Sequence, residues 1–576
     1  MKRILLILIP CLFMLACNTG QKRQQENQVV IHFASESDML NPLMLKTEYS
    51  VYIVRIIFQS LMFPDYKTLE LMPVLAESRP KLEVVNEKLH ITYRIRPEAK
   101  WDNNTPITAK DAEFSLKVLK NPKVEAQRTR LYLETIDSMI FYPDNPRQFT
   151  LVCKDIYFRA EVMSGDFIML PEYVYDPKGL LKEFTVHQLN NPTEELMNNP
   201  KLAEFANDFS NEKFQREKGF VVGSGAYELD SWETGKRIVL KRKQNWWGDA
   251  VKEKNMFFDA YPDKLIYEII PDYTTAEVAM KGGKIDVMFR IPPKDFVKDL
   301  MASEDFHNRF FLFTPPMFLY NFFAINNRLP KFSDKNVRKA LARLVNAPKI
   351  IETVYYNRAQ QTVGPVNPMQ KEYNAKLNPY EYSPQQAKQL LALAGWKDSN
   401  GNGTLDKVIQ GKLTEFTMDL IYNSGNTQRE AICLMFQEEA RKIGIKVNVQ
   451  PLEFSVMTGK LGGYDFEMAC AGVSSSHLPF DYKQQWHTSS ANGGSNVFGF
   501  GTAQTDSIID SIRKELDEDK RIKMSRQLQE IIYEEVPCIF LFVEQDRIAI
   551  SKKFKNADVY SMKPGFWEPG FQPADH

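Results

Sequence analysis

Strand-like and helix-like segments are interleaved along the whole of this chain, and this order limits the fold to a mixed class. Hydrophobic residues alternate with polar ones at 89–95 (LHITYRI), the period-2 pattern of a strand with one buried face. The same alternation recurs at 265–269, 416–420 and 445–449. A chain of 576 residues also exceeds the roughly 250–300 residues that one hydrophobic core supports. We therefore predict α/β or α+β lobes, two or three in number.

Helix boundaries are marked between these strands. Ser383 precedes Pro384, which pairs a capping residue with a proline in the first turn, and Gly395 stands where the hydrophobic face ends. Thr274 and Glu277 have the spacing of a capping box, which predicts a helix that begins after Thr274.

One long stretch lacks a clear period. Residues 190–217 are rich in Asn and in charge and only weakly periodic. This composition predicts a boundary between units or an excursion on the surface.

The N-terminus has the pattern of an export signal followed by a tether. A positive start precedes an apolar run at 4–16, which is shorter than the roughly 20 residues of a spanning helix. A small residue followed by Cys17 resembles the bacterial lipobox, although Met14 stands where leucine is usual. This resemblance implies cleavage before Cys17 and lipidation of its thiol; the alternative is an ordinary signal with an incidental cysteine. Residues 18–28 are polar and predict a solvated tether.

Composition and charge argue against several classes of protein. The chain carries 73 basic and 73 acidic side chains, so it lacks the positive excess expected of a nucleic-acid-binding protein. No segment after the leader is long and apolar enough to span a bilayer. The later cysteines are too scattered for a disulfide scaffold and form no CxxC pair for zinc. We interpret them as buried apolar residues, with one disulfide allowed in an oxidising compartment. They are Cys153, Cys433, Cys470 and Cys538.

The sequence lacks the HExxH, GxSxG and GxxxxGK[ST] motifs, and this absence lowers the expectation of an enzyme. One stretch, DSNGNGTLD, is metal-like: Asp398, Asn400 and Asn402 with Gly403 match the first half of a calcium loop. Ile409 occupies the twelfth position, where such a loop needs a bidentate Glu. We favour a plain Asn/Gly turn, with calcium as the alternative.

Several segments, in order, resemble a family of large binding proteins. They include LNPLMLKTEYSVYIVRIIFQSLMFPD at 40–65, YRIRPEAKWDNNTPITAKDAEFSL at 93–116 and GSGAYELDSWETGKRIVLKRKQNWWG at 223–248. Later segments, down to EEVPCIFLF at 534–542, continue the match. Together they resemble the family 5 extracellular solute-binding proteins of peptide importers.

The resemblance implies an α/β fold of the two-lobed periplasmic-binding-protein type II, with an extra subdomain as in cluster C. Lobe I is then discontinuous, built from N-terminal, middle and C-terminal segments. The implied boundaries are 1–16 for a lipoprotein signal peptide, 17–28 for the tether, 29–60, 218–318 and 540–576 for lobe I, 61–217 for subdomain II and 319–539 for lobe III.

The resemblance also implies a function. The chain is expected to be a lipid-anchored protein on the outer side of a bacterial membrane, which closes its lobes on a small ligand, by default a peptide. It would deliver that ligand to the permease of an ABC importer, and the tether would keep its effective concentration there high. We expect a monomer without a cofactor, catalytic residues or a nucleic-acid partner. The alternatives are a chelate, saccharide or other anionic ligand and, in another class, a secreted hydrolase or a surface adhesion or chaperone protein.

Three segments match the places where this family contacts its ligand. The first follows the LxP motif, the second follows GxID, and the third is the strand and loop after YDF. In the family the first forms an edge that pairs with the peptide backbone, as in strand addition. The implied ligand-binding residues are Thr47, Glu48, Tyr49 and Ser50; Met288, Phe289 and Arg290; and Cys470, Gly472, Ser474 and Asp481.

The third segment departs from the family pattern. Peptide-binding relatives often carry a tryptophan and then an aspartate that pairs with the peptide amine; here these positions match Ala469 and Gly472, although Asp481 could substitute. We infer a different ligand charge, in which Arg290 binds a carboxylate or another anionic group. The alternative is that Arg290 pairs with a neighbouring acid of the protein.

Overall fold

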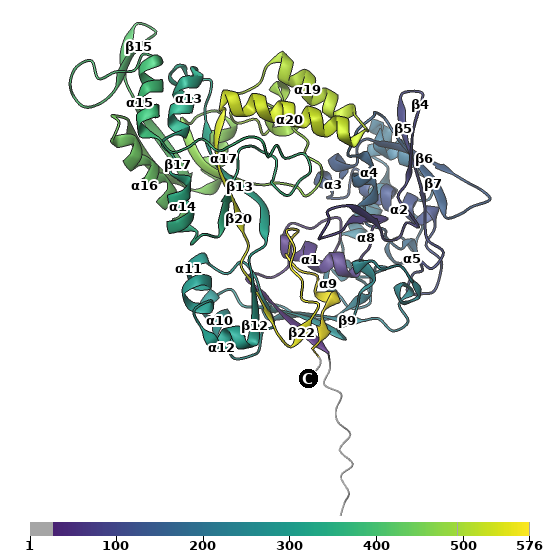
Figure 1. Ribbon diagram of the computed structural model, residues 1–576. Coiled ribbons are helices and arrows are strands. Elements are labelled where there is room, and N and C mark those ends of the chain that lie inside the picture. Colours follow the sequence, from purple (N-terminus) through teal and green to yellow (C-terminus); the bar gives the residue numbers. More distant parts are fainter. Residues whose placement is uncertain (1–26, 492–493, 575–576) are drawn as a thin grey trace, which may run out of the picture.

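Three large sheets organise the computed structural model, which describes residues 27–491 and 494–574 (Figure 1). We call the part built on the seven-stranded sheet lobe I, the part on the four-stranded sheet subdomain II, and the part on the six-stranded sheet lobe III. Lobe III lies at the upper left of Figure 1, subdomain II at the right and lobe I at the base. The chain starts in lobe I, builds subdomain II, returns to lobe I, crosses to lobe III and comes back to lobe I. The predicted two-lobed α/β fold with an extra subdomain is confirmed.

Lobe I has the strand order β12-β21-β11-β1-β10-β9-β8. β1 (Gln28–Phe33) is central and runs parallel to β10 (Lys264–Ile269), so segments far apart in sequence share one core. The other strands are β8 (Tyr227–Glu233), β9 (Arg237–Arg242), β11 (Val287–Met288), β12 (Phe310–Phe313) and β21 (Ile548–Ser551). The helices are α1 (Glu48–Ile57), α10 (Tyr273–Lys281), α11 (Pro293–Asp295) and α12 (Glu304–Arg309). β1 opens within the range predicted for the tether, and Cys17 lies outside the described residues.

Subdomain II has the strand order β4-β5-β7-β6. Its strands are β4 (Lys81–Val85), β5 (Lys88–Arg94), β6 (Ile136–Phe141) and β7 (Gln148–Cys153). Its helices are α2 (Ala109–Lys120), α3 (Gln127–Tyr132), α4 (Ala160–Gly165), α5 (Glu172–Tyr175), α6 (Val186–Asn190), α7 (Glu194–Met197), α8 (Pro200–Phe209) and α9 (Lys213–Arg216). For 190–217 the sequence predicted a boundary or a surface excursion; the surface excursion is wrong, because α8 buries Leu202, Phe205 and Phe209 in the core.

Lobe III has the strand order β14-β20-β13-β19-β17-β18 and is covered by helices on both faces. Neighbouring Phe322 and Phe323 on β13 lie in different hydrophobic clusters, because successive side chains of a strand point to opposite faces. The strands are β13 (Pro316–Ile325), β14 (Ala359–Gln361), β17 (Thr417–Asn423), β18 (Lys446–Leu452), β19 (Met468–Ser474) and β20 (Cys538–Gln545). One face carries α13 (Lys335–Ala342), α14 (Ala347–Val354), α15 (Pro384–Leu393) and α16 (Thr427–Arg441). The other carries α17 (Phe454–Gly462), α18 (Lys483–Trp486), α19 (Ala503–Lys514) and α20 (Glu518–Glu535).

Short two-stranded pieces complete the fold. They are β2 (Met62–Pro64) with β3 (Leu71–Pro73), β15 (Asp406–Ile409) with β16 (Lys412–Glu415), and β22 (Phe554–Lys555) with β23 (Gln572–Pro573).

Two adjacent crossings connect lobes I and III. One leads from β12 into β13 and the other from β20 into β21. The backbone N–H of Asp546 donates to the carbonyl of Pro315 at 2.8 Å, so the crossings lie side by side. β20 pairs with lobe III strands as far as Gln545, and the boundary predicted between residues 539 and 540 therefore falls inside this strand. Two paired crossings of this kind are the geometry of a hinge.

The local patterns translate well into elements. The alternating segment at 89–95 forms β5, and Ser383 caps α15 with Pro384 in its first turn, as predicted. The capping box predicted at Thr274 is wrong: Asp272 caps α10 instead, since its carboxylate accepts the N–H of Thr275 at 2.8 Å.

Close backbone packing fixes the C-terminal end of α1. The N–H of Gly225 donates to the carbonyl of Ile57 at 2.9 Å. A Cβ at Gly225 would lie 2.2 Å from the carbonyl oxygen of Ile56, and one at Gly223 would lie 2.3 Å from that of Ile57. These glycines are therefore needed for close approach rather than for chemistry.

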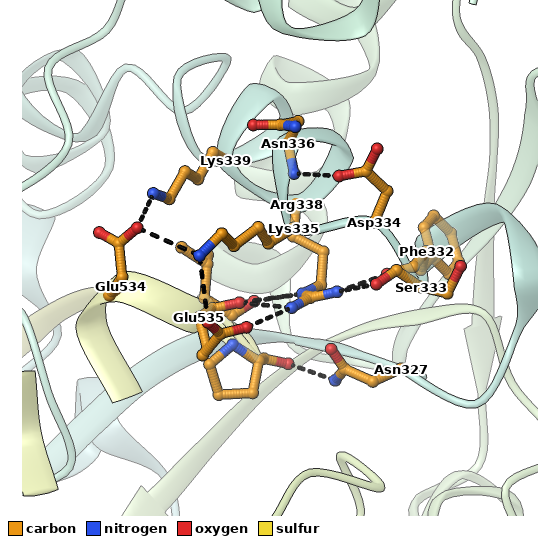
Figure 2. A network of polar contacts seen from close by, with 12 residues as sticks. Asn327, Phe332, Ser333, Asp334, Lys335, Asn336, Arg338, Lys339, Glu534 and Glu535 are labelled. Carbon is orange, nitrogen blue, oxygen red and sulfur yellow. Dashed lines mark hydrogen bonds and ion pairs between the residues drawn. The ribbon is translucent and has the colours of Figure 1, made fainter. Parts of the chain in front are cut away.

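A buried arginine joins two helices of lobe III (Figure 2). Arg338 of α13 donates to the carbonyls of Phe332, Ser333 and Glu535 at 2.7–3.0 Å and to that of Val536 at 3.1 Å. The last two lie at the C-terminus of α20, where carbonyl groups lack partners within the helix. Arg338 therefore satisfies the end of α20 and holds it against α13.

In the part of the chain that the structure describes, no helix combines the length and apolarity that crossing a membrane requires.

Candidate ligand-binding cleft

A cavity of about 380 Å³ lies between lobe I and lobe III, and it is the candidate ligand site. A larger groove, lined by parts of 97–104 and 241–250, belongs to subdomain II and lobe I and does not reach lobe III. Lobe I and the neighbouring β2 region line the cleft cavity with Leu45, Lys46, Thr47, Glu48, Val51, Tyr52, Arg55, Phe63, Tyr66, Ser561, Met562 and Lys563. Lobe III lines it with Phe318, Ser475 and His477. A site with walls from two lobes is the place where ligands are usually enclosed.

The N-terminus of α1 forms one wall. Thr47 caps the helix, and the carboxylate of Asp38 accepts the N–H groups of Lys46 and Thr47 at 3.0 and 3.1 Å. Burial opposes ionisation of Asp38, but hydrogen bonds from Ser50 and Thr47 outweigh it and lower its pKa. The residues that follow Thr47 belong to α1, so the segment is helical where an edge for a peptide backbone was expected. The N–H of Ser50 donates to the hydroxyl of Thr47, and that of Val51 to its carbonyl, both at 3.4 Å.

A carboxylate in this wall is held by three donors. Glu48 accepts hydrogen bonds from Arg290, from Lys563 at 3.1 Å and from the hydroxyl of Tyr52 at 3.0 Å. Burial opposes ionisation of Glu48, but the hydrogen bond and charge of Arg290, followed by those of Lys563, lower its pKa to about 2. Glu48 is therefore ionised at neutral pH, and its charge is shared between two cations.

Arg290 sits at the hinge in an unusual backbone conformation. Its φ is 57°, in the left-handed region that non-glycine residues rarely adopt. Its backbone N–H donates to the carboxylate of Asp546 at 3.0 Å, and that carboxylate also accepts the N–H of Arg547 at 2.7 Å. Burial raises the pKa of Asp546. The hinge residue Asp546 thus fixes the direction in which Arg290 reaches Glu48.

A second ion pair lies under the cavity. Arg55 of α1 donates twice to Asp166 of subdomain II, at 2.5 and 3.0 Å, and its guanidinium lies 4.4 Å from the ring centre of Phe63. Burial raises the pKa of Asp166, although the charge of Arg55 acts to lower it.

The lobe III wall is formed by the start of β13 and the segment after β19. The N–H of Ser475 donates to the carbonyl of Phe318 at 2.8 Å, which continues the pairing of these strands into the cavity. His477 packs edge-on against Phe318, and its Nε2 has no hydrogen-bond partner among the described residues. Burial, and then the charges of Arg55 and Arg159, lower the pKa of His477 to about 4. The imidazole is therefore neutral at physiological pH.

Subdomain II touches lobe III at the edge of this wall, in what we call the rim contact: residues 157–159 against 479–481 and Arg513. The hydroxyl of Tyr157 donates to Asp481 at 2.7 Å, and Nε of Arg159 donates to the carbonyl of Pro479 at 2.7 Å. The guanidinium of Arg513 stacks over the ring of Tyr157 at 4.7 Å. The rim contact therefore holds the segment that follows His477.

Of the first two predicted groups, Thr47 and Glu48 line the cavity. Arg290 does not line the cavity; it donates to the carboxylate of Glu48. This is the alternative interpretation, in which Arg290 pairs with a neighbouring acid of the protein. Tyr49 and Phe289 pack with Phe33 in an aromatic cluster of lobe I. Ser50 and Met288 are buried.

The third predicted group is spread out. Cys470 is buried in the core of lobe III, and Asp481 belongs to the rim contact. At Gly472 a Cβ would lie 2.8 Å from a guanidinium nitrogen of Arg429, so an arginine lies beside the position expected to carry an acid. Ser474 is exposed, one residue before the cavity wall. Ligand contact by any of these residues stays a prediction.

The sequence analysis missed Arg55, Phe318, His477 and Lys563, all of which line the cavity. His477 lies inside the third segment, between the predicted residues Ser474 and Asp481, but no motif distinguishes it there. No local signal marks Lys563, since it reaches Glu48 from a position 515 residues further along the chain.

The calcium-like loop has its oxygens turned onto its own backbone. The carboxylate of Asp398 accepts the N–H groups of Gly401, Asn402 and Gly403 at 2.8–3.1 Å, and Asn400 also accepts that of Asn402 at 3.0 Å. This is the geometry of an Asn/Gly turn. Within the described ranges, no three His, Cys, Asp or Glu residues are grouped as a metal site would require.

Comparison with known proteins gives this architecture a family. The model of the bacterial extracellular solute-binding proteins, family 5, matches residues 70–495. The oligopeptide-binding protein AppA of Bacillus subtilis (strain 168) is 26% identical over 553 residues, which cover 95% of this chain and 91% of AppA. The solved structure of AppA with a nonapeptide has a TM-score of 0.66, 23% identity and coverage of 95% of this chain and 99% of that one. The unliganded open form of the murein tripeptide binding protein MppA has a TM-score of 0.74 at 16% identity and covers 96% and 98% of the two chains. The chain therefore belongs to the bacterial extracellular solute-binding proteins, family 5.

Proposed function

We propose that this protein captures a small ligand, a peptide, by closing lobe III onto lobe I and subdomain II, and that it delivers this ligand to an ABC importer. The single observation that carries the proposal is the cavity with walls from both sides of the hinge. The relative AppA is an oligopeptide-binding protein, and its solved structure holds a nonapeptide. Ser475 and His477 both line the cavity, but the hydroxyl of Ser475 has no hydrogen-bond partner among the described residues, so the two do not form a nucleophile–base pair. The rim contact joins subdomain II to lobe III next to the wall that carries His477, and it is suited to hold the closed form.

Ligand-driven closure is expected in solution. The protein without its leader, mixed with a pool of di- to pentapeptides, should show a smaller radius of gyration by X-ray scattering than the protein alone, because closure brings the lobes together. Mass spectrometry of the released ligand should recover the peptide unchanged. A pool that leaves the scattering profile unaltered, or a peptide recovered cleaved, would contradict the proposal.

We also propose that lipid on Cys17 anchors the protein to the membrane. In a bacterial host, Cys17→Ser should move most of the protein from the membrane fraction to the soluble fraction, because the acyl chains would be missing. Cys11→Ser, a change inside the apolar run, serves as the matched control and should leave the protein with the membrane. Equal release of both variants and the wild type would remove the anchor from the proposal.

A further inference from the structure

The cleft cavity carries more cationic than anionic side chains. Lys46, Arg55 and Lys563 line it, against one carboxylate, that of Glu48. Lys46 is exposed, and its ammonium group forms no ion pair within the part of the chain that the structure describes. Counting the ion-pair partners Arg290 and Asp166, one positive and one negative, leaves the positive excess unchanged.

The one carboxylate of the lining is already engaged. Glu48 accepts from Arg290, Lys563 and Tyr52. A ligand ammonium bound at Glu48 would have to displace one of these donors or share the carboxylate with two cations. A ligand carboxylate, in contrast, meets the ammonium of Lys46 without competition and can join Lys563, which uses one of its three N–H donors on Glu48.

The opposite wall also favours an anion. His477 is neutral, and its Nε2 lacks a partner among the described residues. Two arginines, Arg55 and Arg159, lie close enough for their charges to oppose protonation of His477. The charge of Arg55 is therefore felt in the cavity although Asp166 pairs with it. An imidazole in this field can donate a hydrogen bond to a carboxylate, and such charge-assisted bonds are about twice as strong as neutral ones.

The size of the cavity limits the ligand. A volume of about 380 Å³ lies at the lower end of the range of roughly 300–1,000 Å³ that small-ligand pockets span. This volume suits a short peptide better than a long one.

We propose that the ligand is a short peptide with an excess of carboxylates, and that one carboxylate binds in the cavity that Lys46, Lys563 and His477 line. This inference rests on the proposed peptide-binding function. Lys46 and Lys563 supply the attraction from lobe I. His477 supplies a donor from lobe III, so the same carboxylate links the two lobes when they close.

The test compares three tripeptides of matched length, Glu-Ala-Glu, Gln-Ala-Gln and Lys-Ala-Lys, by titration calorimetry with the protein without its leader. The acidic peptide and its amide analogue have nearly the same shape, so their difference reports the charge. We expect the acidic peptide to bind about tenfold to a hundredfold more tightly than the amide, the range of one hydrogen bond to a charged group. The lysine peptide should bind most weakly.

Two variants locate the preference. Lys46→Met and Lys563→Met should each lower the ratio between the acidic peptide and the amide by at least about threefold, because each removes one cation of the wall. Lys412→Met, an exposed lysine of β16 far from the cavity, is the matched control and should leave the ratio unchanged. Since Lys46 is exposed and only its backbone N–H is bonded, its replacement leaves the fold intact.

Each outcome decides between the inferences. Binding of the amide that equals or exceeds that of the acidic peptide overturns the acidic ligand class, while peptide binding, and with it the proposed function, stands. If both lysine variants still prefer the acidic peptide over the amide as strongly as the wild type does, the carboxylate does not bind in this cavity. Failure of all three peptides to bind contradicts the proposed function itself, and the acidic preference falls with it.

Discussion

Replacement of Arg338 by methionine is expected to lower the free energy of unfolding of lobe III by about 3–5 kcal/mol, the cost of breaking a buried charged network. Arg338 is 5% exposed, and it donates to the backbone carbonyls of Phe332, Ser333, Glu535 and Val536, with one further contact to the carboxylate of Glu535 at 3.5 Å (Figure 2). Methionine preserves the length of the side chain but leaves the carbonyls at the C-terminus of α20 without donors. Urea unfolding followed by circular dichroism measures the loss.

The same helix offers a matched control. Lys335 forms ion pairs with Glu534 and Glu535, but its side chain is 43% exposed. An exposed pair of this kind contributes about 0–1 kcal/mol, so Lys335→Met should have little effect. If Lys335→Met and Arg338→Met destabilise the protein equally, the buried hydrogen bonds are not the reason for the loss.

Removal of the Tyr157 hydroxyl is expected to weaken ligand binding by about tenfold to a hundredfold. The hydroxyl donates to the carboxylate of Asp481 at the rim contact, and a hydrogen bond to a charged group contributes about 1.5–3 kcal/mol. We expect this bond to form only in the closed form, so that Tyr157→Phe lowers the population of that form and, with it, the apparent affinity. Stopped-flow measurement should show that the change lies mostly in a faster dissociation rate.

The ion pair between Arg79 and Glu161 provides the control for this prediction. Glu161 follows closely on the rim segment, but Arg79 lies in the same subdomain and is 61% exposed. Arg79→Met should therefore leave affinity and dissociation rate unchanged. An unaltered dissociation rate in Tyr157→Phe would mean that the rim contact does not hold the lobes closed.

Local sequence patterns predicted β5, β10, β17, β18 and the start of α15 because these patterns depend on near neighbours. The alternation at 89–95 needs only a strand with one buried face, and β5 buries Leu89, Ile91 and Tyr93 as expected. The cap at Ser383 is likewise a contact within three residues. The cap of α10 was predicted at Thr274 but lies at Asp272. Asp and Thr both cap helices, and only the local backbone decides which of two nearby residues does so.

The excursion predicted at 190–217 failed for a different reason. The polar residues that weaken its period cap short helices: Thr193 accepts the N–H of Leu196 in α7, and Asn199 accepts that of Lys201 in α8. A segment of several short capped helices has no long hydrophobic period, although Leu202 and Phe205 are buried.

For the candidate site, too, the sequence predicted which segments take part, whereas the tertiary structure decided which side chains meet. Resemblance along the chain identified the α1 segment and the residues after β11, because both lie in family segments that can be matched in order. It also named Arg290, but the charge that Arg290 faces comes from Glu48, 242 residues earlier.

The sequence by itself determined the mixed fold class, the positions of β5, β10, β17, β18 and α15, and the family, since these follow from periods and motifs that are read locally. Only the tertiary structure decided which charges meet in the cleft: Glu48 with Lys563, Arg55 with Asp166, and His477 opposite them. The physical reason is that the two ion pairs join segments 111 and 515 residues apart in the sequence, and no hydrophobic period records which side chains a folded cavity brings together.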